Sequence, residues 1–488
     1  MSRAEETVAR ATPASGVVDV ILRDGTTLRL RPPTEADVHE LVAFFAQLST
    51  RSRFLRFHGL AAAGESFARG LVDPDWQERG ALVGVLGEPG EERVVAVASY
   101  ARLRDPQTAE AAFAVADELQ RRGIGTRLLE QLAARAAEHG IASFVAEVLP
   151  ENRDMLSVFE NVGFRATRAL EDGVYEVRFP IEPTASYRER VDERDHVAVR
   201  ASLEPFFRPR SVVVVGASAR RGSIGGELFR NVLAADFHGA AYPVNRGAEP
   251  VAGVKAYAAI EEIPDPVDLA VICVPGEGVL EAAESALRHG VRALCVISAG
   301  FAETGSQGRE RQERLLALVR AHGARLVGPN CLGISSAEVG LNATFAPRAF
   351  PPGRIGFSSQ SGALGLALLE RAEARGLGVS AFVSIGNKAD VSSNDLLEWW
   401  EDDPGTDLVL LYLESFGNPR KFARIARRLA RRKPILAMKS GRTGAGRRAA
   451  DSHTAALAGS DAAVDALFHQ AGVVRAETLG ELLDVATL

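Results

Sequence analysis

Hydrophobic and polar residues alternate near the start of the chain in a pattern that predicts two strands followed by a helix. Residues 21–31 alternate around a turn at Asp24-Gly25, which is typical of a strand pair joined by a tight turn. Pro32 and Pro33 end the alternation. Thr34 is expected to cap a helix, because apolar residues follow it at helical spacing: Val38, Leu41, Val42 and Phe45.

Three further apolar runs predict strands at 81–86, 94–103 and 109–115. The glycine-containing turn 120–126 follows the last run and leads into a helix with Leu128, Leu129 and Leu132 on one face. Free N–H groups and the helix dipole make such a helix start an anion site, and the glycines let a pyrophosphate approach the backbone. The motif Q-x-x-G-x-G alone is moderately specific, so a plain strand-to-helix turn stays open as the alternative.

The residues after this turn narrow the interpretation. Residues 144–149 predict another strand, and the pattern N-x-x-M-x-x-x-F-x-x-x-G-F begins at Asn152. Together with the turn, this resembles the GNAT acyltransferase superfamily over residues 18–182. The resemblance implies an α/β GNAT fold and acetyl-CoA as cofactor. The residues it assigns to the cofactor are Gln120, Arg121, Arg122, Gly123, Ile124, Gly125, Thr126 and Asn152.

A general base is expected beside the strand that leads into the turn, since an amine must be neutral to attack a thioester. Glu110 starts this strand, and lysine acetyltransferases that the chain resembles have a glutamate at the corresponding place. The alternative is that Glu110 is only a solvated strand-end residue; Glu147 and Glu118 are weaker candidates for the base. Phe159 departs from the family pattern, in which a tyrosine often protonates the leaving thiolate. Water or another group would then supply this proton, unless the thiolate leaves without one.

A second phosphate-binding pattern follows the charged stretch 183–205, which we interpret as a partly helical linker. The apolar strand 211–215 runs into the glycine-rich turn 216–226, then a helix from Glu227 and a strand at 241–244. This βαβ opening predicts a nucleotide-like ligand. It does not favour NAD, because the glycine spacing is not G-x-G-x-x-G and Asn245 stands where an acidic residue would bind a ribose.

Further parallel strands are predicted at 269–274 and 293–298, before the motif G-P-N-C-x-G at 328–333. This combination resembles the CoA-binding domain of succinyl-CoA synthetase α subunits and NDP-forming acyl-CoA synthetases. The resemblance implies a Rossmann-like CoA-binding domain over residues 206–340. It places CoA against Gly216, Ser218, Ser223, Gly225, Asn245, Pro275 and Asn330. Cys331 is interpreted as a small buried residue rather than a nucleophile.

Residues 341–488 contain a third strand–turn–helix pattern, in which four residues form a candidate phosphate cradle: Ser359, Gln360, Ser361 and Gly362. His453 lies farther on, in a small-residue loop with the pattern S-H-T-x-A-L-A-G. With Glu414 and the cradle, this resembles the phosphohistidine segment of NDP-forming acyl-CoA synthetases, although Ala455 stands where the family usually has glycine. The resemblance implies a flavodoxin-like domain in which His453 carries a phosphoryl group and Glu414 orients the imidazole.

Composition limits the classes of partner. The chain has 488 residues, of which 25% are charged, and a net charge of −6, as in an ordinary soluble protein. No strongly basic domain favours nucleic acid, and three scattered cysteines favour neither a disulfide framework nor a metal site. No apolar stretch suggests a signal peptide or a membrane span, so a cytoplasmic location is expected. Of 57 basic residues only five are lysines, which fits the codon bias of a GC-rich genome.

Three functions remain open. The first is a protein lysine acetyltransferase that modifies a partner such as an acyl-CoA synthetase, with the synthetase-like region as a regulatory CoA-binding module. The second is an α-like subunit of an NDP-forming acyl-CoA synthetase. It would use ATP or ADP only through a separate ATP-grasp partner, because the chain is expected to end about where an α subunit ends. The third is a CoA-responsive binding module without catalysis.

Overall fold

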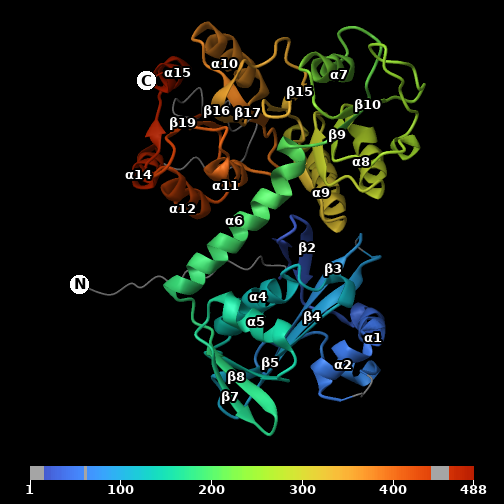
Figure 1. The fold of residues 1–488 in the computed structure, drawn as a ribbon, viewed down its shortest axis with the longest axis vertical. Coiled ribbons are helices and arrows are strands. Elements are labelled where there is room, and N and C mark those ends of the chain that lie inside the picture. The colour runs from blue at the N-terminus through green and yellow to red at the C-terminus, as the bar shows by residue number, and fades with distance from the viewer. Residues whose placement is uncertain (1–15, 60–62, 89, 441–460, 488) are drawn as a thin grey trace. The chain divides into compact units, whose positions relative to one another are not determined.

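The computed structural model describes residues 16–59, 63–88, 90–440 and 461–487 (Figure 1). The chain folds into two compact units, Met1–Ala198 with Arg320–Gly323 and Val199–Val319 with Ala324–Leu488. None of the described helices combines the length and apolarity needed to cross a bilayer. His453 and the rest of the expected phosphohistidine loop lie outside the described residues.

The first unit is built on a mixed sheet with the strand order β1-β2-β3-β4-β5-β6-β8-β7. Its strands are β1 (Val18–Ile21), β2 (Thr27–Arg31), β3 (Arg79–Leu86), β4 (Arg93–Arg102), β5 (Thr108–Val115), β6 (Ser143–Val148), β7 (Thr167–Glu171) and β8 (Val174–Pro180). Its helical elements are η1 (Glu35–Asp37), α1 (Val38–Gln47), α2 (Thr50–Phe57), α3 (Glu65–Arg69), η2 (Asp117–Leu119), α4 (Ile124–Glu138) and α5 (Arg153–Val162). The strands and helices predicted here from apolar spacing are confirmed.

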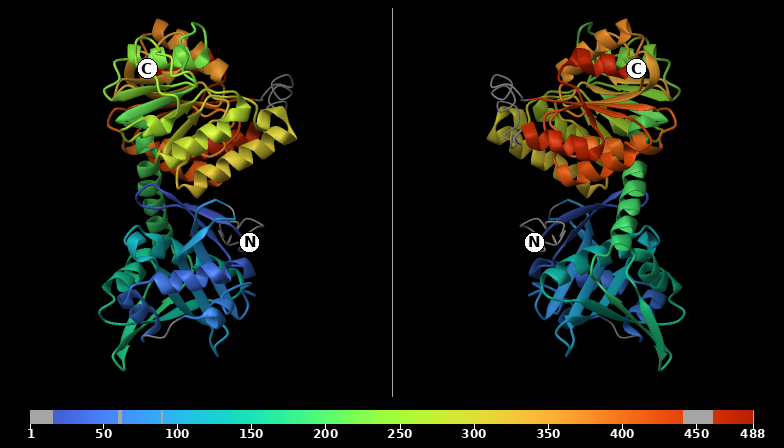
Figure 2. Two further views of the ribbon diagram at one scale, coloured as in Figure 1. Left: turned by 90° about the vertical axis from the view of Figure 1, so that its right-hand side faces the viewer. Right: turned by 90° about the vertical axis from the view of Figure 1, so that its left-hand side faces the viewer.

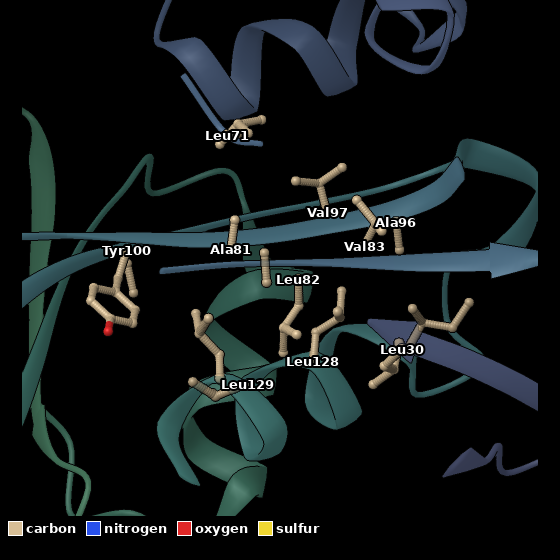
Figure 3. Close-up of a cluster of buried hydrophobic side chains, with 14 of the residues drawn as sticks. Leu30, Leu71, Ala81, Leu82, Val83, Ala96, Val97, Tyr100, Leu128 and Leu129 are labelled. Atoms are coloured by element: carbon tan, nitrogen blue, oxygen red, sulfur yellow. The ribbon is translucent and has the colours of Figure 1, made fainter. Parts of the chain in front are cut away.

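Helix α4 covers one face of this sheet, and its leucines explain why it packs there (Figure 3). Leu128 and Leu129 are fully buried and point toward Leu82 of β3. On the opposite face, Val97 of β4 points toward Leu71. Because both faces are covered, the central strands are almost continuously apolar rather than alternating. Figure 1 shows α5 beside α4, and α4 also contacts β4 and β5.

Helix α6 (Ala185–Phe207) occupies the charged stretch expected to be a partly helical linker. Beyond it, the second unit contains a parallel sheet in the order β10-β9-β11-β12-β13 and a mixed sheet in the order β15-β14-β17-β16-β18-β19-β20.

The elements around the parallel sheet are β9 (Ser211–Val215), α7 (Ile224–Ala234), β10 (Ala240–Val244), η3 (Ile260–Glu262), β11 (Leu269–Ile272), η4 (Gly276–Gly278), α8 (Val279–Arg288), β12 (Ala293–Val296), η5 (Ala302–Thr304), α9 (Ser306–Ala321) and β13 (Arg325–Val327). Those around the mixed sheet are β14 (Gly333–Ser336), β15 (Leu341–Thr344), β16 (Pro352–Ser359), α10 (Gly362–Ala374), β17 (Val379–Ser384), α11 (Ser393–Asp402), β18 (Leu408–Leu413), α12 (Pro419–Leu429), β19 (Ile435–Lys439), α14 (Asp461–Ala471), β20 (Val474–Arg475) and α15 (Leu479–Ala486).

Helices α8 and α9 cover the same core of the parallel sheet, and the left view of Figure 2 shows them along its strands. Residues of both helices join one apolar cluster with β11, including Ala283, Leu315 and Ile272. All five residues of β9 are buried, as expected for a central parallel strand. The parallel sheet is therefore part of a layered α/β arrangement.

The second unit contains a cluster of charged side chains that are largely buried. Arg325 is 4% exposed; its Nε lies 2.7 Å from Asp390 Oδ2, and its Nη2 lies 3.9 Å from Asp395 Oδ2. Lys421 Nζ approaches Asp395 from the other side at 3.4 Å. Asp395 also accepts hydrogen bonds from the backbone N–H and hydroxyl of Ser392 in a capping box. Although burial opposes ionisation, Lys421, Arg325 and these hydrogen bonds lower the pKa of Asp395 to about 2.

Replacing Asp395 by asparagine should remove a pH-dependent part of the stability of the second unit. The folded-state pKa lies below the unfolded value of about 4, so its contribution is present above pH 4 and is lost as the pH falls toward 2. We expect Asp395→Asn to lower the free energy of unfolding by about 2 kcal/mol at pH 7, measured by urea denaturation. Asp484→Asn, which removes an exposed ion pair with Arg375, is the control and should change little. Equal pH dependence in wild type and Asp395→Asn would contradict this expectation.

Candidate functional site

The site of the first unit begins where β5 and β6 separate. These parallel strands pair only over Thr108–Glu110 and Ser143–Val145. Beyond Glu110, β5 stays paired with β4 and β6 stays paired with β8, so the two strands diverge. No strand among the described residues covers the side of β5 that faces this fork. Its backbone donors and acceptors can therefore bind an extended ligand as a neighbouring strand would.

A cleft of about 910 Å³ opens at the fork, between α2, the end of β5, the turn before α4 and the start of α5. Most residues predicted to bind the cofactor line it, namely Gln120, Arg121, Gly123, Ile124, Gly125, Thr126 and Asn152. Arg122 does not; its Nη1 instead lies 3.3 Å from Asp24 Oδ2. Several arginines also line the cleft, so the walls suit a polyanionic ligand.

The turn before α4 presents backbone N–H groups to this cleft. Gly123 precedes the helix with φ 87°, and Arg121 has φ 63°, so both lie in the left-handed region. A Cβ at Gly123 would meet no atom within 4 Å, which leaves the space above the turn open. The 15-residue helix α4 begins here and directs its unsatisfied N–H groups and positive dipole end at the cleft. These are the features that a pyrophosphate needs.

Asp117 fastens α2 to this turn. Its carboxylate accepts hydrogen bonds from the N–H and hydroxyl of Ser49, each at 2.8 Å, and from the Ser52 hydroxyl at 2.6 Å. Partial burial opposes ionisation, but these hydrogen bonds hold the pKa of Asp117 below its usual value. Gln120 Nε2 adds hydrogen bonds to Ser52 Oγ at 3.3 Å and to the Val115 carbonyl at 3.2 Å. The helix and the turn are thus held as one wall of the cleft.

Glu110 lies at the last paired position of β5, at the branch of the fork. Its side chain is exposed and lines a second, smaller cavity of about 260 Å³. Arg56 of α2 lines both this cavity and the large cleft. Nothing local in the sequence distinguishes Arg56 from the other arginines of α2, so sequence patterns alone do not identify it.

The other candidates of the first unit have different surroundings. Glu118 forms an exposed ion pair with Arg93 at 3.2 Å, and Glu147 lies 3.9 Å from His58 Nδ1. Phe159 is 2% exposed, and its ring centroid lies 5.0 Å from that of Phe179. A core ring at this position offers no proton to a leaving thiolate. Asn152 caps α5 by accepting a hydrogen bond from the Met155 N–H at 3.2 Å, a structural role besides any in binding.

In the second unit, the predicted CoA-binding residues gather at one edge of the parallel sheet. Gly216, Asn245 and Pro275 follow the carboxyl ends of β9, β10 and β11. The chain runs from β9 to β10 on one side and then to β11 on the other, so β9 and β11 flank a topological switch point. Ligands of open α/β sheets bind at such an edge.

Two glycines bring the turn and the backbone together here. Gly216 has φ 89°, and a Cβ there would lie 2.8 Å from the Cys273 carbonyl oxygen. A Cβ at Gly225 would lie 2.2 Å from the Gly216 carbonyl oxygen, which allows α7 to approach the end of β9. Gly225 is therefore needed for close helix packing, whatever ligand the turn binds.

The polar side chains at this edge already have partners within the protein. Ser218 Oγ accepts from the Arg220 N–H at 3.2 Å, and Ser223 Oγ donates to the Arg220 carbonyl at 2.7 Å. Asn245 exchanges two hydrogen bonds with the backbone of Glu249, each at 2.9 Å. Asn330, with φ 59°, donates to Asn387 Oδ1 at 3.3 Å. These hydrogen bonds fix the side chains that shape the edge.

The mixed sheet brings the predicted phosphate cradle to Glu414. Gln360 Oε1 accepts hydrogen bonds from the backbone N–H groups of Glu414 and Ser415, the latter at 2.8 Å. Ser361 caps α10 by accepting from the Leu364 N–H at 3.4 Å, and Ser359 Oγ donates to the Ser361 carbonyl at 2.7 Å. The cradle and the end of β18 are thus adjacent.

Lys388 lies beside Glu414 and the phosphate cradle, although no sequence motif indicated it. Its Nζ donates to the Ser415 carbonyl at 3.0 Å and to the Ser415 hydroxyl at 2.6 Å. Burial lowers the pKa of Lys388 to about 8, and the nearby Glu414 carboxylate opposes this shift. Burial also lowers the pKa of Lys439, again opposed by Glu414. The scarcity of lysine in the chain was the one signal that could have drawn attention to Lys388.

The close approach of Gly225 generates a stability prediction. In Gly225→Ala the new methyl group would overlap a backbone carbonyl that cannot move without shifting β9 or α7. We expect a loss of about 1–3 kcal/mol in the free energy of unfolding of the second unit, measured by chemical denaturation. Gly278→Ala is the matched control, since its Cβ would make only an ordinary 3.6 Å contact with Val274. Equal losses in the two variants would show that the packing of α7 does not require a glycine.

Comparison with protein families divides the chain into three matches. Residues 53–164 match the acetyltransferase (GNAT) family, residues 210–337 a CoA binding domain, and residues 352–488 the succinyl-CoA ligase like flavodoxin domain.

Among individual proteins, the α subunit of acetate–CoA ligase (ADP-forming) I from Pyrococcus furiosus is 43% identical over 289 residues, 58% of this chain and 63% of that subunit. The dinucleotide-forming acetyl-coenzyme A synthetase 1 of Ca. Korarchaeum cryptofilum, solved with phosphate and ADP, is 41% identical with a TM-score of 0.56, covering 58% of this chain and 61% of that one. The GNAT domain of S. lividans PAT is 36% identical with a TM-score of 0.32, covering 34% of this chain and 98% of that domain.

The matched region thus spans less than two thirds of the Pyrococcus furiosus subunit, and 42% of acetate–CoA ligase (ADP-forming) I from Archaeoglobus fulgidus. Acetyl-CoA and CoA are the ligands that the matched domains support. The expected α/β fold class and its three kinds of domain are confirmed. The chain therefore joins an acyltransferase domain of the GNAT family to a CoA-binding domain and a succinyl-CoA ligase-like flavodoxin domain.

Proposed function

We propose that this protein is an Nε-lysine acetyltransferase that takes acetyl groups from acetyl-CoA and modifies partner proteins, acyl-CoA synthetases among them. The observation that carries the proposal is the place of Glu110. It lies at the branch of the β5–β6 fork and lines a second cavity, whose lining shares Arg56 with that of the cofactor cleft. A carboxylate at the meeting point of two substrates is what a general base requires.

In this mechanism the turn 120–126 and the start of α4 bind the pyrophosphate. The uncovered backbone of β5 aligns the extended part of acetyl-CoA, so that the thioester reaches the fork. Glu110 accepts a proton from the incoming lysine ammonium, directly or through one water molecule. The neutral nitrogen then attacks the thioester carbon, the C–N bond forms, the C–S bond breaks and CoA leaves as a thiolate. The second nitrogen proton passes to water as the amide forms. Phe159 supplies no proton to that thiolate, so water is its proton source.

The CoA-binding and ligase-like domains serve as a regulatory region in this proposal. They offer a second CoA site at the edge of the parallel sheet, separate from the cleft of the acyltransferase domain. Such a region would bind the same thioesters whose synthesis the proposed partners carry out. Regulation of this kind requires only that CoA or acyl-CoA bind differently to two states of the protein.

Glu110→Gln is the first test of the acetyltransferase proposal. The amide cannot accept the proton, so kcat for transfer from labelled acetyl-CoA to an acyl-CoA synthetase should fall about 10²- to 10⁴-fold. Binding of CoA, measured by calorimetry, should stay within twofold. Glu118→Gln, which changes an exposed carboxylate outside the cleft, is the matched control and should retain wild-type kcat. Unchanged acetylation by Glu110→Gln would show that another group is the base.

A second candidate function rests on the ligase-like domain. We infer as the alternative that the chain works as an α-like subunit of an NDP-forming acyl-CoA synthetase, with a phosphohistidine and a separate ATP-grasp partner. The hydrogen bonds from the backbone N–H groups of Glu414 and Ser415 to Gln360 favour this alternative. They join the phosphate cradle to Glu414, the residue expected to orient His453. The 43% identity to an ADP-forming ligase α subunit is in agreement.

Phosphorylation with ATP labelled on its terminal phosphate tests this alternative. With an ATP-grasp subunit present, acid-labile label should appear on the wild-type chain and be lost in His453→Asn. His469→Asn replaces an exposed histidine of α14 and should keep the label. Label that survives in His453→Asn, or no label with any ATP-grasp subunit supplied, would exclude the phosphohistidine function while leaving the acetyltransferase proposal intact.

A further inference from the structure

Arg56 occupies the junction between the two cavities of the acyltransferase domain. It is the residue that the linings of the large cleft and of the Glu110 cavity have in common. The cleft receives the acyl donor in the proposed function, and the smaller cavity receives the amine. A side chain common to both linings is therefore placed where the thioester carbon and the attacking nitrogen must meet.

The charged end of Arg56 lies against aromatic rings. Its guanidinium carbon lies 5.0 Å from the ring centroid of Phe57 and 5.9 Å from that of Phe67. Within the described residues, no acidic group lies at ion-pair distance from it and no hydrogen bond occupies its donors. Burial lowers the pKa of Arg56 from its usual value, opposed only by the charge of Glu110. The guanidinium still stays protonated at neutral pH.

The helix that bears Arg56 is fixed before any ligand arrives. Ser49 caps α2 by accepting from the Ser52 N–H at 3.1 Å, and Asp117 binds both serines. The aromatic rings beside the guanidinium then restrict the end of the side chain. Removing a guanidinium from water without an anionic partner lowers the free energy of unfolding, and an anion bound beside it would offset this loss. The arrangement is thus suited to a negative charge that forms during the reaction.

The carbonyl oxygen of the thioester gains negative charge when the tetrahedral intermediate forms and loses it when the intermediate collapses. When the nitrogen attacks, the π electrons of the C=O bond move to the carbonyl oxygen. They return when the C–S bond breaks and the thiolate departs. Glu110 has already taken one proton from the lysine ammonium, and the second nitrogen proton passes to water as the amide forms, so the step needs no other reactant. The positive charge of Arg56 favours the neutral amine over the ammonium at the junction, which assists the transfer of the proton to Glu110.

We propose that Arg56 is a further catalytic residue, whose guanidinium donates hydrogen bonds to the thioester oxygen and stabilises its charge in the tetrahedral intermediate. This inference rests on the proposed acetyltransferase function. In this mechanism Glu110 accepts the proton of the lysine, and Arg56 stabilises the negative charge on the thioester oxygen.

Steady-state kinetics provide the first test. Removing one oxyanion donor costs about 10²- to 10³-fold in kcat, so Arg56→Gln should show that loss while KM for acetyl-CoA changes less than threefold. Arg56→Lys should recover part of it. Arg53→Gln is the matched control, since Arg53 lies on the same helix and lines neither cavity.

Binding of two CoA analogues tests the same inference without catalysis. S-carboxymethyl-CoA carries a carboxylate one bond beyond the position of the thioester carbon, whereas S-acetonyl-CoA carries a neutral carbonyl at that same place. Wild type and Arg53→Gln should bind the carboxymethyl analogue at least tenfold more tightly, and Arg56→Gln should lose this preference. Thermal unfolding of each variant shows that the domain remains folded.

The outcomes separate the two proposals. If wild type acetylates no lysine yet prefers the carboxymethyl analogue through Arg56, the acetyltransferase function fails and the oxyanion site stands. If wild type is active and Arg56→Gln keeps its kcat and the analogue preference, Arg56 is not an oxyanion donor and the acetyltransferase function stands. A loss confined to KM would assign Arg56 to substrate binding and would likewise overturn the inference.

Discussion

The cleft of the acyltransferase domain exists because two neighbouring strands in the middle of its sheet, β5 and β6, separate. β5 and β6 share three paired residues and then separate, while each remains paired on its other side. The separation exposes backbone donors and acceptors that a continuous sheet would satisfy, and these are tolerable only where solvent or a ligand reaches them. The cleft, the anion-binding turn and Glu110 all lie around this opening. The strong packing of α4 on the sheet keeps the two halves in place despite the lost pairing.

The second unit obtains its ligand edge by different means. There the sheet is continuous and parallel, and the edge forms where successive strands end at a switch point. Close backbone approach at Gly216 and Gly225 shapes the turn, while buried charge at Arg325 and Asp395 ties β13 to α11. Burying these ions is costly in isolation, and the mutual pairing of Arg325, Asp390, Asp395 and Lys421 offsets that cost.

Much of this architecture could be predicted residue by residue. Strand β9 begins and ends where the apolar run 211–215 placed it, and the glycine-containing turn 120–126 precedes α4 as predicted. The start of α7 was predicted three residues late, because Ile224, Gly225 and Gly226 have little local helical signal and are held in the helix by packing against Gly216 and Ser218. Arg122 was grouped with the cofactor turn by its position in the motif, yet it pairs with Asp24.

Short patterns along the chain were sufficient for the fold class, the three motif-bearing regions and Glu110 as a candidate base. They succeed because glycine turns, helix caps and apolar periodicity act between near neighbours. Arg56 and Lys388 could not be found in this way, since their surroundings come from distant segments. Arg56 meets the cleft only because Asp117 fastens α2 beside β5, and Lys388 meets Glu414 only because β17 and β18 flank β16. Burial and charge pairing are properties of the folded neighbourhood, so the roles of these two cations were decided by tertiary packing.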